Sequence, residues 1–259
     1  MSIITMIGAG QMASALSFPL RENGHEVRLV GTPLDRSVIE RLRLDRFHLN
    51  LKRTLPAGIR AFQIEELSLA LQGADVVLNG VSSFGLQWFS ENILPVLPED
   101  KPLLSVTKGL MNTEEGELIP YPFYLESRLP EGKKLDINAI GGPCTSYELA
   151  DRDDSHVAFC GRKMETLQKL KELFACSYYH VSLSTDIVGV ESAVALKNAY
   201  ALGVTLAVGL SEKRDGKIGA IHYNSQAALF GQSIREMRSL LRFLSMTRSG
   251  RNFYPLSPD

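Results

Sequence analysis

The stretch that decides the fold lies at the start of the chain, where residues 3–30 read IITMIGAGQMASALSFPLRENGHEVRLV. The apolar run at residues 3–7 predicts a β-strand, and the turn GAGQMA at residues 8–13 follows it at once. Residues 14–21 predict a helix, and residues 26–30 predict a second strand. A strand, a glycine turn, a helix and a second strand in this order are typical of a dinucleotide-binding unit.

The small residues of this turn each have a physical role in such a unit. Gly8 permits the tight turn, Gly10 lets the backbone approach a pyrophosphate, and Ala13 is small enough for the helix to pack on the strand. The helix N-terminus then offers N–H groups and the positive end of a dipole to the phosphates. The pattern alone leaves one alternative open, a glycine turn that needs a positive φ and binds nothing.

The composition is that of a globular protein without a strong charge. The 259 residues suit one large or two smaller domains, 44% of them are hydrophobic, and the formal net charge is −1. This balance predicts no nucleic-acid partner and no attraction to an acidic membrane. Cys144, Cys160 and Cys176 lack metal-ligand spacing, so no metal site is expected. Their odd number and wide separation indicate a reducing compartment, which predicts a cytoplasmic protein.

Two segments of the chain are apolar enough to be considered as a signal peptide or a membrane span. The apolar start lacks a basic leading segment and is interrupted by the glycine turn, so it is not expected to be a signal peptide. Residues 190–210 form the most apolar long stretch, but Glu191, Lys197 and Asn198 interrupt it. We therefore predict a buried helix there and no membrane span.

The order of predicted elements indicates two domains. Short strands and helices alternate through residues 1–183, which predicts an α/β fold with a Rossmann-like, mostly parallel sheet covered on both faces. After Ser184 the pattern changes to two helical segments, at residues 186–210 and 219–244. Residues 184–259 are therefore predicted to form a smaller all-helical domain.

The remaining elements of the first domain follow from the same periodicities. Trp88 and Phe89 are expected in the core beneath the helix that carries them. Further strands are predicted at residues 74–81, 102–106, 136–140, 155–160 and 178–183, further helices at residues 36–46, 65–72, 86–97 and 163–175, and a turn into a helix at residues 141–150.

The end of the second strand leaves the choice between NAD and NADP open. An NAD site commonly has an acid near this point, but Gly31 occupies the strand end and the nearest acid, Asp35, comes later. Asp35 has an alternative role as the cap of the next helix. Arg36 and Arg41 are basic residues suited to a 2′-phosphate, so both cofactors stay under consideration.

Polar residues follow three of the predicted strands of the first domain. Ser82 follows the strand at residues 74–81 directly, at the edge where an open α/β sheet binds its ligand. Lys108 follows the strand at residues 102–106; it is either a solvated turn lysine or an ammonium that faces an anionic or carbonyl substrate. The turn at residues 141–146 leads into a helix and is either an anion site or a plain turn capped by Thr145 or Ser146.

Lys197 stands out because small and apolar residues surround it in the segment SAVALKNAYALG, residues 192–203. One interpretation is a lysine that extends from a partly exposed helix into solvent. The other is a lysine held in apolar surroundings, whose lowered pKa suits proton transfer near neutrality. Asn198 is then expected to be buried beside it and to need hydrogen-bond partners.

Taken together, these motifs resemble those of the NAD(P)-dependent glycerol-3-phosphate dehydrogenases. The resemblance covers about the first 240 residues with similar spacing, and the combination is more specific than any one motif. The matching segments are Gly8-Ala9-Gly10, Lys108-Gly109, Gly142-Pro143 followed by Glu148, Leu196-Lys197-Asn198, and the helix at residues 224–237 with its Ala227-Ala228 and Glu236-Met237.

The resemblance implies the interconversion of dihydroxyacetone phosphate and sn-glycerol 3-phosphate with NAD or NADP as cofactor. It implies that Lys197 is the acid/base for the C2 oxygen and that Lys108 lies between cofactor and substrate. A cation near the carbonyl oxygen would stabilise the developing alkoxide. The other implied cofactor residues are Gln11, Met12, Thr32 and Ser146, and the other implied substrate residues are Gly142, Cys144 and Asn198.

Two departures from the family pattern leave alternatives open. Cys144 stands where the family has serine or threonine, which makes it a weaker hydrogen-bond donor. The family's glycine-rich segment with an essential aspartate is absent after residue 244, so the helical domain is expected to be shortened. Arg251-Asn252 is then either the remnant of the family's phosphate clamp or a chance match.

Three functions and one assembly state therefore remain as expectations. The first function is an active dehydrogenase that takes a small phosphorylated substrate. The second is a reductase resembling ketopantoate reductase, and the third is an inactive relative that binds a dinucleotide. Apolar surface left by a shortened helical domain favours a homodimer.

Overall fold

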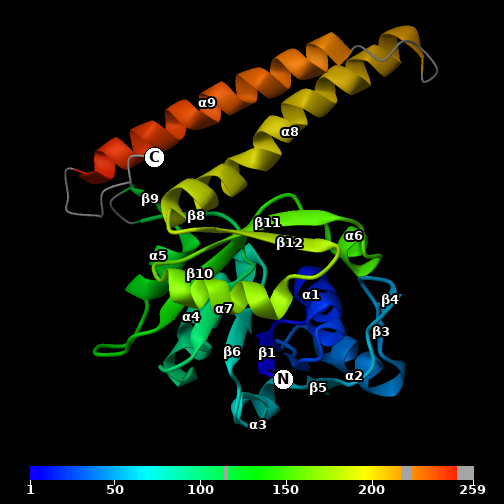
Figure 1. Ribbon diagram of the computed structural model, residues 1–259, viewed down its shortest axis with the longest axis vertical. Helices are drawn as coiled ribbons and strands as arrows, with labels where there is room; N and C mark the ends of the chain where they lie inside the picture. Colours follow the sequence, from blue (N-terminus) through cyan, green and yellow to red (C-terminus); the bar gives the residue numbers. More distant parts are fainter. Residues whose placement is uncertain (114–115, 217–222, 250–259) are drawn as a thin grey trace. The chain divides into compact units, whose positions relative to one another are not determined.

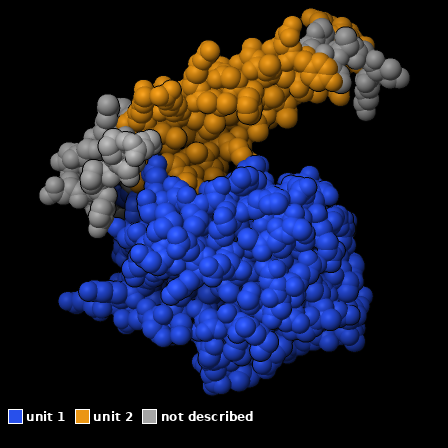
Figure 2. Space-filling model, in the orientation of Figure 1, with its two compact units in different colours: residues 1–187 blue, residues 188–259 orange. Residues whose placement is uncertain are grey.

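The computed structural model describes residues 1–113, 116–216 and 223–249 of the chain. The chain divides into two compact units, Met1–Ile187 and Val188–Asp259, which Figure 2 shows in different colours. The sequence indicated a boundary after residue 183, close to the end of the last strand of the first unit.

An eight-stranded sheet forms the centre of the first unit, in the order β12-β11-β10-β7-β6-β1-β2-β5. Every neighbouring pair is parallel except β10 with β11, so the predicted mostly parallel sheet is confirmed. The strands are β1 (Ile3–Ile7), β2 (Glu26–Val30), β5 (Ile59–Phe62), β6 (Val76–Asn79), β7 (Pro102–Ser105), β10 (Asp136–Gly141), β11 (Ser155–Cys160) and β12 (Tyr179–Ser184).

Both faces of this sheet are buried, because side chains alternate along each strand. In β1, Ile4 and Met6 pack into one apolar cluster, whereas Ile7 packs into a second. Helices cover both faces (Figure 1). They are α1 (Gln11–Glu22), α2 (Arg36–Asp45), α3 (Leu67–Leu71), α4 (Leu86–Asn92), α5 (Tyr121–Ser127), α6 (Ser146–Ala150) and α7 (Met164–Phe174).

The register of the central strands sets the place of the site. Ile7 at the end of β1 is paired with Val30 of β2 and with Asn79 of β6. Three parallel strands therefore end at the same level, and the glycines that follow them, Gly8, Gly31 and Gly80, meet at one edge of the sheet. In a doubly wound sheet this edge, beside the first strand, is where a ligand binds.

Several short elements had no clear signal in the sequence. Strand β5 is four residues long, and the strands of the two small hairpins have two or three residues, too few to show an alternation. These short elements are β3 (Phe47–His48) with β4 (Arg53–Thr54), β8 (Leu110–Asn112) with β9 (Leu118–Pro120), and the 3₁₀ segment η2 (Ser83–Gly85). The 3₁₀ segments η1 (Ile64–Glu66) and η3 (Leu94–Val96) overlap the helices predicted at residues 65–72 and 86–97.

The described part of the second unit is helical, as predicted, and consists of α8 (Ile187–Asp215) and α9 (Tyr223–Ser249). The predicted burial of residues 190–210 holds at Glu191 and Ser192, which are buried, but is wrong for the rest of the segment, where no residue is fully buried. Leu202, Leu206 and Leu210 form a stripe along α8 and are 60%, 64% and 68% exposed. The physical reason is that each of two long helices can cover only one face of the other.

Helix α8 is long and apolar enough to cross a membrane by length and composition alone. This is weak evidence for a span, because the same helix carries Glu191 and Lys197. The prediction that the chain has no membrane span is unchanged.

Candidate active site

The glycine turn is pressed between the ends of β2 and β6. The Gly8 N–H donates to the Val30 carbonyl at 2.8 Å, and the Gly80 N–H donates to the Ile7 carbonyl at 2.7 Å. Gly8 has a φ of +104°, and a Cβ added to it would lie 2.8 Å from the carbonyl carbon of Gly80. Only glycine satisfies both the backbone conformation and the close approach.

Helix α1 begins directly against the same strand end. A Cβ added to Gly10 would lie 3.3 Å from the Gly80 carbonyl oxygen, and a Cβ added to Gly80 would lie 2.5 Å from the Cβ of Ala13. Larger side chains would clash at Gly80, Gly10 and Ala13, because helix α1 and the end of β6 touch there through backbone atoms and a methyl group. Met12, in the same first turn, is half-buried against the core.

This junction fits the pyrophosphate of a dinucleotide. Helical hydrogen bonding starts with the Ser14 N–H, which donates to the Gly10 carbonyl at 3.0 Å, so the earlier amides of α1 are not used inside the helix. Those amides and the positive end of the helix dipole favour an anion, and the glycines leave room for the ligand to approach the backbone.

The loop after β2 is tied to the glycine turn through Asp35. Its Oδ2 accepts hydrogen bonds from the Thr32 N–H at 2.8 Å, from the Thr32 hydroxyl at 2.7 Å and from the Ala9 N–H at 3.2 Å. Asp35 occupies the N-cap position of α2 without a side-chain cap hydrogen bond. The interpretation of Asp35 as a helix-capping side chain is therefore wrong, because its carboxylate is held by Thr32 and Ala9 instead.

The basic residues suggested for a 2′-phosphate already have carboxylate partners. Arg36 pairs with Glu65, and Arg41 pairs with Asp45 at 2.6 Å within α2. All four side chains are exposed, so these pairs are weak and exchange readily with solvent. The choice between NAD and NADP is therefore not decided by a preformed basic site.

A buried polar network joins the ends of β6 and β7. The Asn79 amide donates to the hydroxyls of Ser105 at 3.1 Å and Thr107 at 3.2 Å, and the Thr107 hydroxyl donates to the Val81 carbonyl at 2.7 Å. Because buried polar groups need partners, this network fixes the two strand ends together. It holds the segments that lead to Ser82, which is exposed, and to Lys108.

This network was missed by the sequence analysis. Its signal was present as a lone polar residue, Asn79, inside the apolar strand VVLNG. A buried asparagine needs several partners, but the sequence does not show that they come from a strand 26 residues away.

Lys108 is half-buried at the C-terminal edge of the sheet, next to the turn after β10. Its ammonium donates to the Gly142 carbonyl at 3.2 Å. Gly142 has a φ of +135°, and a Cβ added to it would lie 3.0 Å from the Cα of Val157. The structure thus brings together two of the residues named by the family resemblance, although 34 positions separate them.

The turn before α6 contacts the glycine turn through Ser146. The buried Ser146 hydroxyl donates to Oε1 of Gln11 at 3.1 Å, and Nε2 of Gln11 donates to the Asn50 carbonyl at 3.1 Å. Thr145 occupies the N-cap position of α6, as one of the two alternatives expected, but without a side-chain cap hydrogen bond. The Thr145 hydroxyl instead bonds to Glu148.

The remaining candidate residues lie in different surroundings. Cys144 is half-buried and packs against an apolar core cluster. Lys197 and Asn198 are exposed on α8, so the predicted apolar enclosure of both is wrong, for the same reason that α8 itself is exposed. Arg251 and Asn252 lie outside the described residues.

Comparison with known protein families shows which family the chain belongs to. A model of the NAD-dependent glycerol-3-phosphate dehydrogenase N-terminus matches residues 3–166, and a model of the C-terminus of the same enzymes matches residues 186–257. The chain belongs to the NAD-dependent glycerol-3-phosphate dehydrogenase family. The predicted family, fold class, enzyme class and cofactor class are confirmed: this is a family of oxidoreductases that use NAD or NADP.

Two relatives show the extent of the match. The NADP(+)-dependent glycerol-3-phosphate dehydrogenase of Archaeoglobus fulgidus is 33% identical over 247 residues, which are 95% of this chain and 71% of that protein. The glycerol-3-phosphate dehydrogenase [NAD(P)+] of Bacillus velezensis is 29% identical over 245 residues, which are 93% of this chain and 66% of that protein. The chain thus spans about two thirds of the length of these relatives.

Solved structures of the family share the fold. The glycerol-3-phosphate dehydrogenase of Coxiella burnetii matches with a TM-score of 0.75 and 22% identity over 93% of this chain and 69% of that one. The enzyme of Saccharomyces cerevisiae matches with a TM-score of 0.74 and 20% identity over 96% of this chain and 71% of that one.

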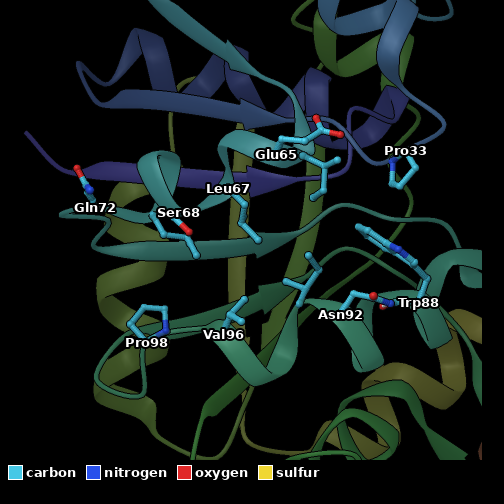
Figure 3. Close-up of a pocket in the computed structure, with 12 residues that line it drawn as sticks. Pro33, Glu65, Leu67, Ser68, Gln72, Trp88, Asn92, Val96 and Pro98 are labelled. Carbon is cyan, nitrogen blue, oxygen red and sulfur yellow. The ribbon is translucent and has the colours of Figure 1, made fainter.

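The first unit also has a surface pocket whose lining includes no residue of the glycine turn. It is lined mainly by η1, α3, α4 and η3, and Pro33 and Trp88 stand at one end of it, whereas Gln72 and Pro98 stand at the other (Figure 3). Phe89 is fully buried as predicted, and Trp88 is half-buried: it packs against the same apolar cluster and also lines this pocket. Adjacent helix positions face different directions, so only Phe89 is enclosed on all sides.

The described part of the chain contains no candidate metal site. There, no three or more His, Cys, Asp and Glu side chains gather in an arrangement that could hold an ion.

Proposed function

We propose that this chain interconverts dihydroxyacetone phosphate and sn-glycerol 3-phosphate, with NAD or NADP as the hydride carrier. The observation that carries the proposal is the edge of the sheet where the glycine turn lies between β2 and β6. Lys108 leaves β7 at the same edge and contacts Gly142. Membership of the family supports the substrate pair, which the geometry of the first unit alone does not specify.

The proposed reaction needs a hydride, a proton and a site for negative charge. The nicotinamide, when bound, supplies or accepts the hydride at C2 of the substrate. In the reducing direction Lys197 gives its ammonium proton to the C2 oxygen as the carbonyl becomes an alcohol, and in the oxidising direction its amine takes the proton back. Lys108 places a second positive charge beside the reacting oxygen and stabilises the developing alkoxide.

The other candidate residues have binding roles in this proposal. Gly142, Cys144 and Asn198 contribute to the substrate site, and Arg251 with Asn252 holds the substrate phosphate through the guanidinium fork. The cofactor contacts are assigned to Gly8, Gly10, Gln11, Met12, Ala13, Thr32, Ser82, Lys108 and Ser146. The odd number and wide separation of Cys144, Cys160 and Cys176 support the cytoplasm as the compartment.

A direct assay tests this function and its alternatives. Purified protein is expected to oxidise NADH or NADPH in the presence of dihydroxyacetone phosphate, and the two cofactors are compared at equal concentration. Cofactor binding without turnover would favour a dinucleotide-binding relative without catalytic activity. Turnover with ketopantoate instead would favour the ketopantoate-reductase alternative and exclude the proposed substrate.

We also propose that the chain forms a homodimer through the apolar stripe of α8. Leu202, Leu206 and Leu210 lie one turn apart on that helix and are largely exposed, and such a stripe is costly to leave in water. Replacing Leu206 and Leu210 by glutamine is expected to convert a dimer into a monomer in sedimentation equilibrium. A wild-type protein that is monomeric at all concentrations tested would contradict this assembly.

A further inference from the structure

His48 is a fully buried histidine whose two ring nitrogens both have backbone partners. Nδ1 accepts a hydrogen bond from the Leu51 N–H at 3.0 Å, and Nε2 lies 2.9 Å from the Ala9 carbonyl oxygen. The Leu51 N–H is a hydrogen-bond donor and needs an acceptor with a free lone pair, so Nδ1 of His48 carries no proton. Nε2 must then carry the proton and donate it to Ala9. The hydrogen bonds therefore select the neutral tautomer with the proton on Nε2.

Ala9 is the middle residue of the Gly8-Ala9-Gly10 turn, and its peptide groups are held on both sides. Its carbonyl accepts from His48 and its N–H donates to Oδ2 of Asp35 at 3.2 Å. We propose that His48 and Asp35 are positioning residues that clamp Ala9 and so preorganise the glycine turn for the cofactor pyrophosphate. This inference rests on the proposed function, because it assigns the turn to a dinucleotide.

The clamp acts on the neighbouring amide through peptide geometry. The Ala9 carbonyl and the Gly10 N–H belong to one planar trans peptide group and point in opposite directions. Fixing the carbonyl on His48 therefore also fixes the direction of the Gly10 N–H. A turn that is already ordered loses less conformational entropy when a ligand binds, which strengthens binding without a new ligand contact.

The small hairpin of β3 and β4 brings His48 to this position. Helix α2 ends at Asp45, its C-cap residue Arg46 has the left-handed conformation with a φ of 61°, and β3 begins at the next residue. The hairpin is held at two further points: Gln11 donates to the Asn50 carbonyl, and Arg53 pairs with Asp151 at 2.6 Å. The hairpin thus joins the glycine turn to the end of α6.

The ionisation of His48 bears on the clamp. Burial lowers the pKa of His48 below its usual 6.5, and the hydrogen bond to Ala9 and the charge of Asp35 oppose this shift. Arg53 pairs with His48 across the hairpin register but is engaged by Asp151. Protonation of Nδ1 would remove the acceptor of the Leu51 N–H, so the clamp is intact only when the ring is neutral.

Three substitutions at His48 and Asp35 test the clamp. The dissociation constants for NADH and NADPH are measured by quenching of Trp88 fluorescence. His48→Phe removes both hydrogen bonds, and Asp35→Asn weakens the acceptor for Ala9. Both are expected to bind cofactor about tenfold more weakly or worse. His48→Gln keeps an amide donor near the position of Nε2 and is expected to bind within about threefold of wild type.

The controls separate positioning from a general loss of structure. His180→Gln changes a histidine on β12 that is exposed, and it should leave the dissociation constants unchanged. Circular dichroism reports whether His48→Phe folds; if it does not, His48→Asn is used instead, which keeps the acceptor for Leu51 but is too short to reach Ala9. Wild-type affinity in the variant that folds would overturn the clamp.

Two further measurements distinguish this inference from the proposed function. The affinity of wild type for NADH is expected to fall as the pH is lowered below 6.5, whereas that of His48→Gln stays level over the same range. Hydrogen exchange at the Ala9 amide needs no cofactor, and Asp35→Asn is expected to accelerate it about tenfold. Unchanged exchange would reject the clamp, while normal protection in a wild type that binds no cofactor would reject only the proposed function.

Discussion

Replacing Lys197 by alanine is expected to lower kcat for dihydroxyacetone phosphate reduction about 10³-fold. The reason is that proton transfer by a positioned acid contributes about 10²- to 10⁴-fold to such a reaction. The dissociation constant for NADH should stay within about twofold, since the cofactor contacts that we propose lie elsewhere in the chain. Steady-state kinetics and a fluorescence titration on the same preparation measure both quantities.

The matched control for Lys197 is another lysine of the same helix. Lys213 is also exposed on α8, and Lys213→Ala removes the same charge from the same element. It should leave kcat and cofactor affinity unchanged. If Lys197→Ala weakened NADH binding as much as it lowered kcat, Lys197 would not be the acid/base. Partial recovery of turnover by added small primary amines would support the assignment.

The second large effect is expected from Gly8→Ala. A Cβ at this position would meet the Gly80 carbonyl carbon at 2.8 Å, and the φ of +104° is strained for alanine. Strain and overpacking each cost about 1–3 kcal/mol, so we expect a loss of about 2–4 kcal/mol in the free energy of unfolding. The glycine turn has to move, and NADH affinity should fall by about 100-fold or more.

Urea unfolding and cofactor titration check the Gly8 prediction, and Gly209 supplies the control. Gly209 lies in α8, is exposed, and a Cβ added to it would meet no atom within 4 Å. Gly209→Ala should raise the free energy of unfolding by up to about 1 kcal/mol, because alanine has the higher helix propensity. Wild-type stability and cofactor affinity in Gly8→Ala would contradict this prediction, because they would mean that the turn accommodates a Cβ without a clash.

The site was predictable from the sequence where a contact is local in the chain. The close packing of Gly8 and Ala13 follows from a strand–turn–helix pattern that is read within eleven residues, and the structure shows both contacts against Gly80. The position of Lys108 at a strand end was also visible. The partner of its ammonium, the Gly142 carbonyl, comes from the turn after β10, a strand that pairs with β7 only in the folded sheet.

The predictions of burial that the structure contradicts share one cause: they inferred burial from the apolar character of a segment. Residues 190–210 were expected to be buried because most of them are apolar, but hydrophobicity states a preference and not the area that neighbouring elements can cover. Lys197 and Asn198 were expected in an apolar enclosure for the same reason. Whether an apolar segment is covered depends on how many elements pack around it, which no local pattern records.

The sequence by itself determined the order of the longer strands and helices, the glycine turn and the family of this protein. These depend on short-range periodicity and on residue types that backbone conformation demands. Only the tertiary structure decided that Asp35 bonds to Ala9 and that His48 holds the opposite side of the same residue. The reason is that hydrogen bonds between residues 26 and 39 positions apart exist only after the strands have assembled and the hairpin has closed on the turn.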